Sequence, residues 1–391
     1  MIYDCLFPYT IGGGERWFRE LAARLAVEGY DVTYLTLRQW DSGERPTSGA
    51  GVRVVPVGPR MKLYVGGRRR IVPPLVFGVG VLWHLLRHGR RYDVVHTCSF
   101  PFFSLLAAAA LKPFGRYALV VDWFEVWTLD YWREYLGRVG GRIGWLVQRL
   151  CAAIPQQAIC LAHKHARRLV AEGLRSEPLV LRRGLYGAPP DAKLRRPADP
   201  LVVFIGRLIP EKQADAVVPA VTLARQEIPG LRGLILGDGP ERAHIQEMIA
   251  RLGPDPPVSA PGFVEDGELS GALARALCMI LPTRREGLGT VVLEAAALGV
   301  PSVVVEGPDN GATELIEPGS NGFIAPSASP TDLASAFAAV YRGGQDLRDR
   351  TVSWYEAHAP EMSLDVALAV VVASYRRSRE ASSVTPPSGR S

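Results

Sequence analysis

Strand-like and helix-like segments alternate along this chain, and the pattern occurs twice. In each half, short apolar runs typical of buried strands are separated by longer stretches with helical periodicity and by turns rich in glycine and proline. Such alternation predicts an α/β protein with parallel, doubly wound sheets. The predicted strands are 2–7, 31–37, 52–57, 93–97, 118–122 and 158–161 in the first half, and 201–205, 233–236, 258–260, 279–282 and 300–305 in the second.

The length of 391 residues exceeds one ordinary core and predicts two domains. Residues 186–200 contain a glycine, four prolines and several charges, as linkers do. We therefore expect two Rossmann-like domains, over 1–185 and 186–354, facing each other across a cleft at the carboxyl ends of their strands. A helix at about 355–380 is expected to pack back on the first domain, and the Ser/Pro-rich tail over 381–391 to be disordered.

The segment from Glu286 to Glu294 carries the strongest indication of a ligand. It reads as a loop and then a helix that ends at Gly299. The turn that leads into the helix consists of Gly287, Leu288, Gly289 and Thr290. Amides at a helix N-terminus attract an anion such as a phosphate. Glu294 lies in an otherwise apolar run, where a carboxylate is costly to bury unless it accepts hydrogen bonds, for example from ribose hydroxyls. An anion site beside such an acceptor predicts a nucleotide-sugar site.

Two cations follow the first predicted strand of the second half. Gly206 permits close backbone approach, while Arg207 and Lys212 bring a planar guanidinium and a mobile ammonium that both suit a diphosphate. Either cation alone is more often a surface residue. Lys212 is, however, one of five lysines beside 40 arginines, which favours a function. After the third strand of that half, Gly262 and Phe263 are candidates to line a nucleobase pocket.

A glycine turn joins the first predicted strand to the first helix. Gly12 and Gly13 let backbone amides approach a phosphate or a sugar, with a plain tight turn as the alternative. The turn lacks GxGxxG spacing, so a Rossmann dehydrogenase is not supported. After the strand at 118–122, aromatic and acidic side chains suit a sugar ring or a lipid acceptor, although aromatics are also ordinary core. These acceptor-side candidates are Trp123, Phe124, Glu125 and Trp127.

Residues 45–92 contain ten lysines and arginines and no carboxylate. Between two arginine clusters lies the apolar run 71–86, which holds two prolines and is too short for a membrane span. Two interpretations remain open: a core helix with solvated flanks, or an interfacial segment over 60–91 that contacts an anionic membrane surface. The net charge of +6 reflects an arginine-rich composition and does not indicate nucleic acid.

Five cysteines show neither metal-ligand spacing nor a pairing pattern, which suits a reducing cytosol. The start of the chain lacks a basic region followed by an apolar one, so no signal peptide is predicted. We therefore expect a cytoplasmic protein, peripheral at the inner face of the membrane where the segment 60–91 contacts lipid. The first strand begins almost at Met1, so a few further residues are expected upstream.

In this order, the motifs resemble those of glycosyltransferase family 4, the retaining nucleotide-sugar transferases of GT-B fold. The resemblance covers about 2–333 and is most specific at 206–212 and 286–294. Gly12 and Gly13 match the Gly-Gly of the family's N-terminal domain. The implied partners are a nucleotide sugar and a saccharide or lipid-linked acceptor of the cell envelope.

The resemblance also implies roles for individual residues. Glu286 lies by the donor sugar, Glu294 holds the ribose, and Arg207 and Lys212 carry the diphosphate. The amides after Glu286 contact sugar and phosphate. No metal or other cofactor is expected, because cations and helix N-termini neutralise the leaving diphosphate. Anomeric configuration is retained by front-face attack, and domain closure assembles the site.

Three departures from the family pattern stand out. Phe124 replaces the histidine of the family's Trp-His-Glu-Val-Trp, and neither His96 nor His163 takes its place in the sequence. Residues 161–163 read Leu-Ala-His where the family tends to have Val-Ser-Glu, and Arg183 replaces an asparagine before a glycine. The third departure is the early start of the first strand.

These departures keep three functions open. The leading one is an active hexosyltransferase. The second is a degenerate family member that binds nucleotide or a partner without turnover, for which Phe124 is the best support. The third is a GT-B sugar epimerase, which needs acid/base side chains that the sequence does not place. The motifs specify neither the nucleobase, the sugar and the acceptor nor the oligomeric state.

Overall fold

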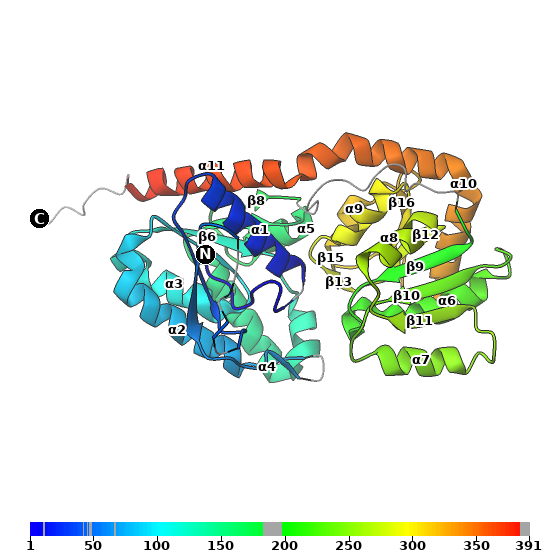
Figure 1. Cartoon of the computed structure of the whole chain (residues 1–391), viewed down its shortest axis with the longest axis horizontal. Helices are drawn as coiled ribbons and strands as arrows, with labels where there is room; N and C mark the ends of the chain where they lie inside the picture. Colours follow the sequence, from blue (N-terminus) through cyan, green and yellow to red (C-terminus); the bar gives the residue numbers. More distant parts are fainter. Residues whose placement is uncertain are drawn as a thin grey trace, which may run out of the picture. The chain divides into compact units, whose positions relative to one another are not determined.

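The computed structural model describes residues 1–10, 12–41, 43–44, 46, 49–65, 68–182 and 198–383. The chain divides by its internal contacts into two compact units. Unit 1 comprises Met1–Leu181 with Asp365–Ser391, and unit 2 comprises Arg182–Leu364. Figure 1 labels their elements. The predicted linker at 186–200 and tail at 381–391 lie largely outside the described residues, and Arg183 lies wholly outside them.

Unit 1 is built on parallel strands in two groups that the start of the chain joins. Ile2 bridges Leu35 on one side and Thr97 on the other, both in parallel. The order across the unit is therefore β2-β1-Ile2-β5-β6-β7-β8. These strands are β1 (Val32–Leu37), β2 (Val52–Gly58), β5 (Val94–Cys98), β6 (Ala118–Trp123), β7 (Gln157–Cys160) and β8 (Leu179–Val180).

The predicted strand at 2–7 is wrong beyond Ile2, and a side chain provides the reason. The amide of Gln39 donates to the Asp4 carbonyl at 3.1 Å and accepts from the Leu6 backbone amide at 3.3 Å. Backbone groups that a strand would pair with its neighbour are thus satisfied by a side chain. Pro8, just beyond, has no amide hydrogen to donate.

The helices of unit 1 include one from the far end of the chain. The Tyr375 hydroxyl of α11 lies 2.7 Å from Nδ1 of His96 in β5, and Arg24 donates to Asp365 at 2.8 Å. The helices are α1 (Gly13–Val27), α2 (Val72–His88), α3 (Phe102–Gly115), α4 (Leu129–Ala152), α5 (His163–Ala171) and α11 (Leu364–Ser383). Shorter elements are η1 (Gly89–Arg91) and the hairpin β3 (Tyr64–Val65) and β4 (Arg68–Arg69).

The structure corrects the single helix predicted at 355–380. α10 (Pro330–His358) ends first, and a 3₁₀ turn, η6 (Ala359–Met362), separates it from α11. Pro360 lies in that turn, where its missing amide hydrogen interrupts the helical hydrogen-bond ladder.

Unit 2 contains a six-stranded sheet whose described pairings are all parallel. The order is β11-β10-β9-β12-β14-β16, so the chain builds outward from β9 in one direction and then from β12 in the other. The carboxyl ends of β9 and β12 therefore form a topological switch point, where ligands bind in doubly wound folds. The strands are β9 (Leu201–Ile205), β10 (Arg232–Leu236), β11 (Val258–Gly262), β12 (Cys278–Leu281), β14 (Ser302–Val305) and β16 (Gly322–Ala325).

Helices cover the sheet of unit 2, and their apolar side chains form one core with it; Phe204, Val221 and Phe337 are among its fully buried members. The helices are α6 (Val217–Ala224), α7 (Arg242–Ala250), α8 (Asp266–Arg275), α9 (Thr290–Ala297) and α10. Short elements lie at the carboxyl edge or precede a helix: η3 (Pro210–Lys212), η4 (Ala214–Ala216), β13 (Arg285–Glu286), β15 (Asp309–Asn310) and η5 (Gly311–Leu315).

Candidate functional site

The loops after β9, β10 and β11 are joined by backbone hydrogen bonds at the carboxyl edge of unit 2. Gly206 donates to the Leu236 carbonyl at 3.0 Å, and Gly237 donates to the Gly262 carbonyl at 3.0 Å. Gly237 has a φ of +142°, and a Cβ there would lie 1.8 Å from the Gly206 oxygen, so only glycine fits. This close packing holds the predicted Gly206 and Gly262 in adjacent loops of one edge.

Across the switch point, four charged side chains pair between the loops after β9 and β12. The Lys212 ammonium donates to the Glu286 carboxylate, and Arg285 lies 3.9 Å from Glu211. All four side chains are between 16 and 18% exposed, so they are partly shielded yet reachable from solvent. The sequence predicted Lys212 and Glu286, and the structure brings them into contact. Arg207, by contrast, is exposed.

Two buried polar residues fix the strand that carries Glu286. The Asn310 amide nitrogen donates to the carbonyls of Thr283 and Val305 at 3.1 and 2.8 Å, and its oxygen accepts from Ala312 at 3.0 Å. Thr283 Oγ1 lies 2.9 Å from the Glu211 carbonyl. Sequence reasoning missed both residues. Their signal is a polar side chain shortly after each of two adjacent apolar strands.

The helix α9 begins at Thr290, as predicted, and Gly299 follows its end with a φ of +71°. Gly289 precedes the helix with a φ of +81°, and a Cβ there would lie 2.8 Å from Ala312 Cβ. As a glycine, Gly289 offers no side chain to cap this helix. Because the first amides of a helix lack intrahelical partners, the turn 287–290 is a candidate site for an anion. The Leu288 side chain is buried, so only the backbone amide of this residue is a candidate to contact an anion.

Glu294 is partly exposed, whereas the flanking Leu293 and Ala295 are buried. The helix therefore turns this carboxylate toward the edge of the core, which reduces the expected cost of burial.

The predicted nucleobase candidates lie at the end of β11. The Phe263 side chain is 77% exposed, and Gly262 has a φ of +107°. A Cβ at Gly262 would lie 2.6 Å from a guanidinium nitrogen of Arg242, which donates to the Pro261 carbonyl at 2.8 Å. Arg242 was not predicted. It places a cation directly beside the turn.

In unit 1, the glycine turn has its own anion. Gly12 precedes α1, and a Cβ there would lie 2.5 Å from an Oε2 of Glu15, which is buried in the first helical turn. A carboxylate at this position interacts favourably with the helix dipole. The arrangement favours the tight-turn alternative for Gly12 and Gly13.

The acceptor-side candidates divide into core and partly exposed residues. Trp123 is fully buried and donates to Gln156 at 2.9 Å, and Trp127 is 8% exposed and donates to Glu125 at 2.8 Å. Both indoles pack the interior, as the core alternative stated. Phe124 and Glu125 are partly exposed. The Phe124 ring meets Tyr3 edge-on, with centroids 6.4 Å apart.

Side chains that sequence reasoning missed hold this loop in place. The backbone of Trp127 both donates to and accepts from the Gln148 amide, at 3.1 and 2.9 Å, and Val126 donates to Nδ1 of buried His165 at 3.2 Å. Gln148 also donates to Glu172 at 2.6 Å, while burial raises the pKa of that carboxyl.

Within the described part of the chain, no group of three or more His, Cys, Asp or Glu side chains could hold a metal ion. Nor does any helix among those residues have the length and apolar character to cross a membrane. All five cysteines are buried thiols.

Known proteins resemble both halves of the chain. A model for a glycosyl transferase 4-like domain matches residues 12–184, and one for glycosyl transferases group 1 matches 190–353. Glycogen synthase of Mycobacterium tuberculosis is 28% identical over 85% of this chain and 82% of its own length. A GDP-mannose-dependent α-(1-6)-phosphatidylinositol monomannoside mannosyltransferase of the same organism is 32% identical over 39% of this chain and 40% of its own length.

The match spans 14 to 40% of the length of the first curated relatives. Among solved structures, Anabaena HepE in complex with UDP has a TM-score of 0.72 at 17% identity, covering 96% of this chain and 98% of that one. This likeness confirms the predicted GT-B fold of two Rossmann-like domains, and the two models confirm the predicted family. The chain belongs to the group 1 glycosyltransferases of the GT4 family, which transfer a sugar from a nucleotide sugar.

Proposed function

We propose that this chain is a retaining hexosyltransferase whose acceptor is a saccharide or lipid-linked sugar of the cell envelope. One observation carries the proposal. At the switch point of unit 2, the Lys212–Glu286 pair, the N-terminus of α9 and the Glu294 carboxylate lie along one edge of one sheet. A Cβ at Gly289 would lie 3.4 Å from Glu286 Cγ, so the anion site and the charged pair are neighbours.

Each part of this edge suits one part of a nucleotide sugar. Arg207, Lys212 and the amides of α9 take the diphosphate, and Glu294 accepts hydrogen bonds from the ribose hydroxyls. Gly262 and Phe263 line the nucleobase, with Phe263 offering an exposed ring. Diphosphate oxygens compete with Glu286 for the Lys212 ammonium. Glu286, once released, accepts from a hydroxyl of the donor sugar.

In the transfer, the bond between the anomeric carbon and the diphosphate oxygen breaks. The acceptor hydroxyl oxygen bonds to the same face of that carbon, and its proton passes to the leaving diphosphate. The protein contributes positioning and electrostatic stabilisation. Since cations and amides meet the leaving charge, we expect the reaction to proceed in EDTA.

The acceptor class is supported by the mannosyltransferase relative, which is named for a phosphatidylinositol mannoside. The outer face of α2 supports a location at the inner surface of the membrane, because several of its apolar side chains are exposed beside arginines. The segment 60–91 would then bring the enzyme to a lipid-linked acceptor.

A titration of UDP, GDP and ADP, with their common sugars, in EDTA tests the donor site. We expect one nucleotide series to bind, and Glu294→Ala and Lys212→Ala each to lower its affinity by at least about tenfold, as loss of a charge-assisted hydrogen bond implies. Glu247→Ala and Arg251→Ala are matched controls, because this exposed pair lies on α7. Unchanged affinity in the two site variants would refute the site assignment.

Binding without turnover is the second candidate, and Phe124 favours it. Its ring packs against Tyr3 and Phe18, with centroids 6.4 and 6.3 Å away, where a family member often has a histidine. Phe124→His distinguishes the two. Gain of transfer activity supports a decayed site, whereas loss of an existing activity shows that Phe124 contacts the acceptor.

A further inference from the structure

Unit 1 presents helices whose sequences contain no carboxylate. Neither α2, nor α3, nor the second arm of α4 at 138–152 includes Asp or Glu. Of the twenty large apolar side chains that are exposed among the described residues, twelve lie on α2, on α3, on the second arm of α4 or directly before α2. Exposed apolar surface of this extent marks an interaction site.

The helix α2 is apolar on both faces. Its inner face, with Phe77, Val81 and Leu85, is buried, as the core interpretation predicted. Its outer face is exposed: Val79 by 67% and Leu86 by 62%. The interpretation of α2 as a core helix therefore explains its inner face but not its exposed apolar outer face.

The helix α4 is a hairpin with a second exposed face. Gly137, with a φ of +76°, reverses the chain, and the second arm returns against the first. Its glycines permit this packing, since a Cβ at Gly144 would lie 2.5 Å from the Trp132 ring. The opposite side carries an apolar row at spacings of three and four residues. The row is Val139, Ile143, Leu146 and Leu150, each between 57 and 73% exposed.

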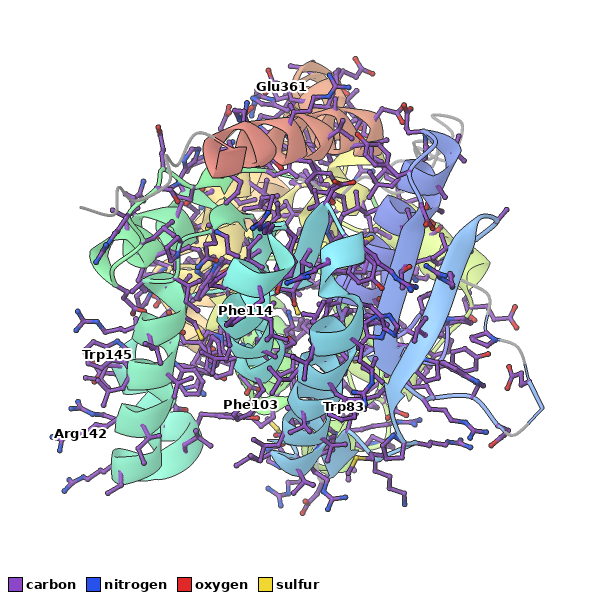
Figure 2. The ribbon with its side chains drawn as sticks, turned by 90° about the vertical axis from the view of Figure 1, so that its left-hand side faces the viewer. Trp83, Phe103, Phe114, Arg142, Trp145 and Glu361 are labelled. Atoms are coloured by element: carbon purple, nitrogen blue, oxygen red, sulfur yellow. The ribbon has the colours of Figure 1, made fainter. Side chains whose placement is uncertain are left out.

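Each of the two helices also carries a tryptophan with an arginine one turn later; Trp83 is 58% exposed, while Trp145 is partly buried and donates to Glu172 at 3.2 Å. The Arg87 guanidinium lies 3.1 Å from the Trp83 ring centroid, and that of Arg149 lies 4.9 Å from Trp145. Figure 2 shows Trp83, Phe114 and Trp145 along the three helices on one side of unit 1. Tryptophan and arginine together are typical of the boundary between lipid headgroups and acyl chains.

We propose that α2, α3 and the second arm of α4 form one docking surface for an anionic lipid bilayer. The second arm of α4 adds a contact to the one already proposed for the segment 60–91. This inference rests on the membrane location proposed above. The exposed arginines of α4 face headgroup phosphates, and its apolar row enters the interface. A second copy of the chain fits this face less well. It would bring Arg138, Arg142 and Arg149 against their own like charges with no carboxylate to pair them.

Vesicle flotation of the full chain tests the surface. We expect binding to mixed phosphatidylcholine/phosphatidylglycerol vesicles and weaker binding to phosphatidylcholine alone. The α4 double variant Ile143→Ser/Leu146→Ser should lower partitioning by about tenfold or more, as loss of two apolar side chains from the interface implies. Arg142→Ala/Arg149→Ala should lower it about tenfold on the anionic vesicles alone. Val27→Ser/Leu252→Ser removes two exposed apolar side chains elsewhere, at the end of α1 and just after α7, and should have no effect.

Three outcomes would overturn the proposal: no binding by the wild-type chain, unchanged binding by both α4 variants, or a dimer that Ile143→Ser/Leu146→Ser dissociates in sedimentation velocity. The nucleotide titration above is repeated on each variant. A variant that still binds the donor but no longer binds vesicles shows that this surface is separate from the donor site. If the wild-type chain binds vesicles but no nucleotide, the result counts against the proposed function alone.

Discussion

The helix N-terminus of α1 in unit 1 and that of α9 in unit 2 meet different charges. At α1, buried Glu15 folds back toward Gly12, so the first amides already face a carboxylate of the chain. At α9, the residue before the helix is Gly289, which has no side chain to cap it and provides a sharp turn at positive φ. A helix N-terminus thus faces a carboxylate of its own first turn in unit 1, whereas in unit 2 we propose that it binds a ligand anion.

One polar cluster of each unit shows a similar difference. The cluster of unit 2 consists of the two charged pairs at the edge of the sheet, with each side chain 16 to 18% exposed. The cluster of unit 1 is a buried chain: Trp17 donates to Asp122 at 2.6 Å, Asp122 lies 3.4 Å from His96, and His96 bonds Tyr375. Buried networks of this kind mainly specify a fold, whereas shielded but reachable charges are available for chemistry.

The largest effect is expected at Asn310, which links fold and site in unit 2. Asn310→Ala removes three hydrogen bonds and leaves two carbonyls and an amide buried, so the free energy of unfolding should fall by about 3 kcal/mol. Donor affinity should fall with it, because Glu286 loses its support. Asn321→Ala is the control, since this residue is equally buried but caps a turn after η5. Urea unfolding and nucleotide titration measure stability and donor affinity in both variants. Equal donor affinity in both would contradict the link between Asn310 and the donor site.

Next comes a direct comparison of the two glycine turns. Gly289→Ala should lower the free energy of unfolding by about 2 kcal/mol, because an alanine there is strained at positive φ and crowds Ala312. Gly13→Ala should be neutral or slightly stabilising, since Gly13 begins α1 and no atom lies within 4 Å of the added Cβ. Thermal melts and donor titration measure both. Weaker donor binding by Gly13→Ala would mean that the turn at Gly12 and Gly13 binds the ligand after all.

Tyr375→Phe tests the buried chain of unit 1. It removes the hydroxyl that faces His96 Nδ1, so the free energy of unfolding should fall by about 1–2 kcal/mol. Donor affinity should stay the same. Tyr341→Phe on α10, where the side chain is 47% exposed, is the matched control. A change in donor affinity without a change in stability would mean that this chain of hydrogen bonds serves the site.

The smallest effect is a pH dependence that belongs to unit 1. Burial, with smaller contributions from His88, the N-terminus and Arg53, lowers the pKa of His84 to about 4. Protonation therefore favours the unfolded chain, and stability present above the unfolded value of 6.5 is lost as the pH falls toward 4. Because His84 is partly exposed, we expect a loss of roughly 1 kcal/mol between neutral and mildly acidic pH.

Urea unfolding at both pH values checks this. His84→Gln should flatten the dependence, and His244→Gln, at an exposed position of α7, should not. If the wild type and both variants lose the same stability on acidification, His84 is not the cause of the pH dependence.

The contrast also explains what could be predicted from the sequence. The parallel strands and the helix beginning at Thr290 were predicted because glycines, apolar runs and helix boundaries are local signals. Lys212 and Glu286 were each predicted as site residues, and only the structure shows that they are in contact. Backbone amides at a helix start need no particular side chain, so a motif of nine residues was enough to predict an anion site there.

What the sequence did not reveal depends on distant side chains. The Gln39 side chain accepts the Leu6 amide hydrogen that a neighbouring strand would otherwise accept. Asn310 and Gln148 donate to the backbone carbonyls of Thr283 and Trp127, which are far from them in the chain. Polar side chains that pair with buried backbone leave no periodic trace. For Trp123, an aromatic residue after a strand reads the same whether it is buried or faces a ligand, and only its 0% exposure distinguished the two.

The hydrogen bond between His96 and Tyr375 has a consequence for synthesis of the protein. Its partners are 279 residues apart, and all of unit 2 lies between them. At about 5–20 residues per second, a ribosome needs roughly 14–56 s to add that stretch, so β5 leaves the ribosome long before α11 exists. We therefore expect unit 1 to complete its fold only after unit 2 has been synthesised, with His96 lacking its hydrogen-bond partner until then.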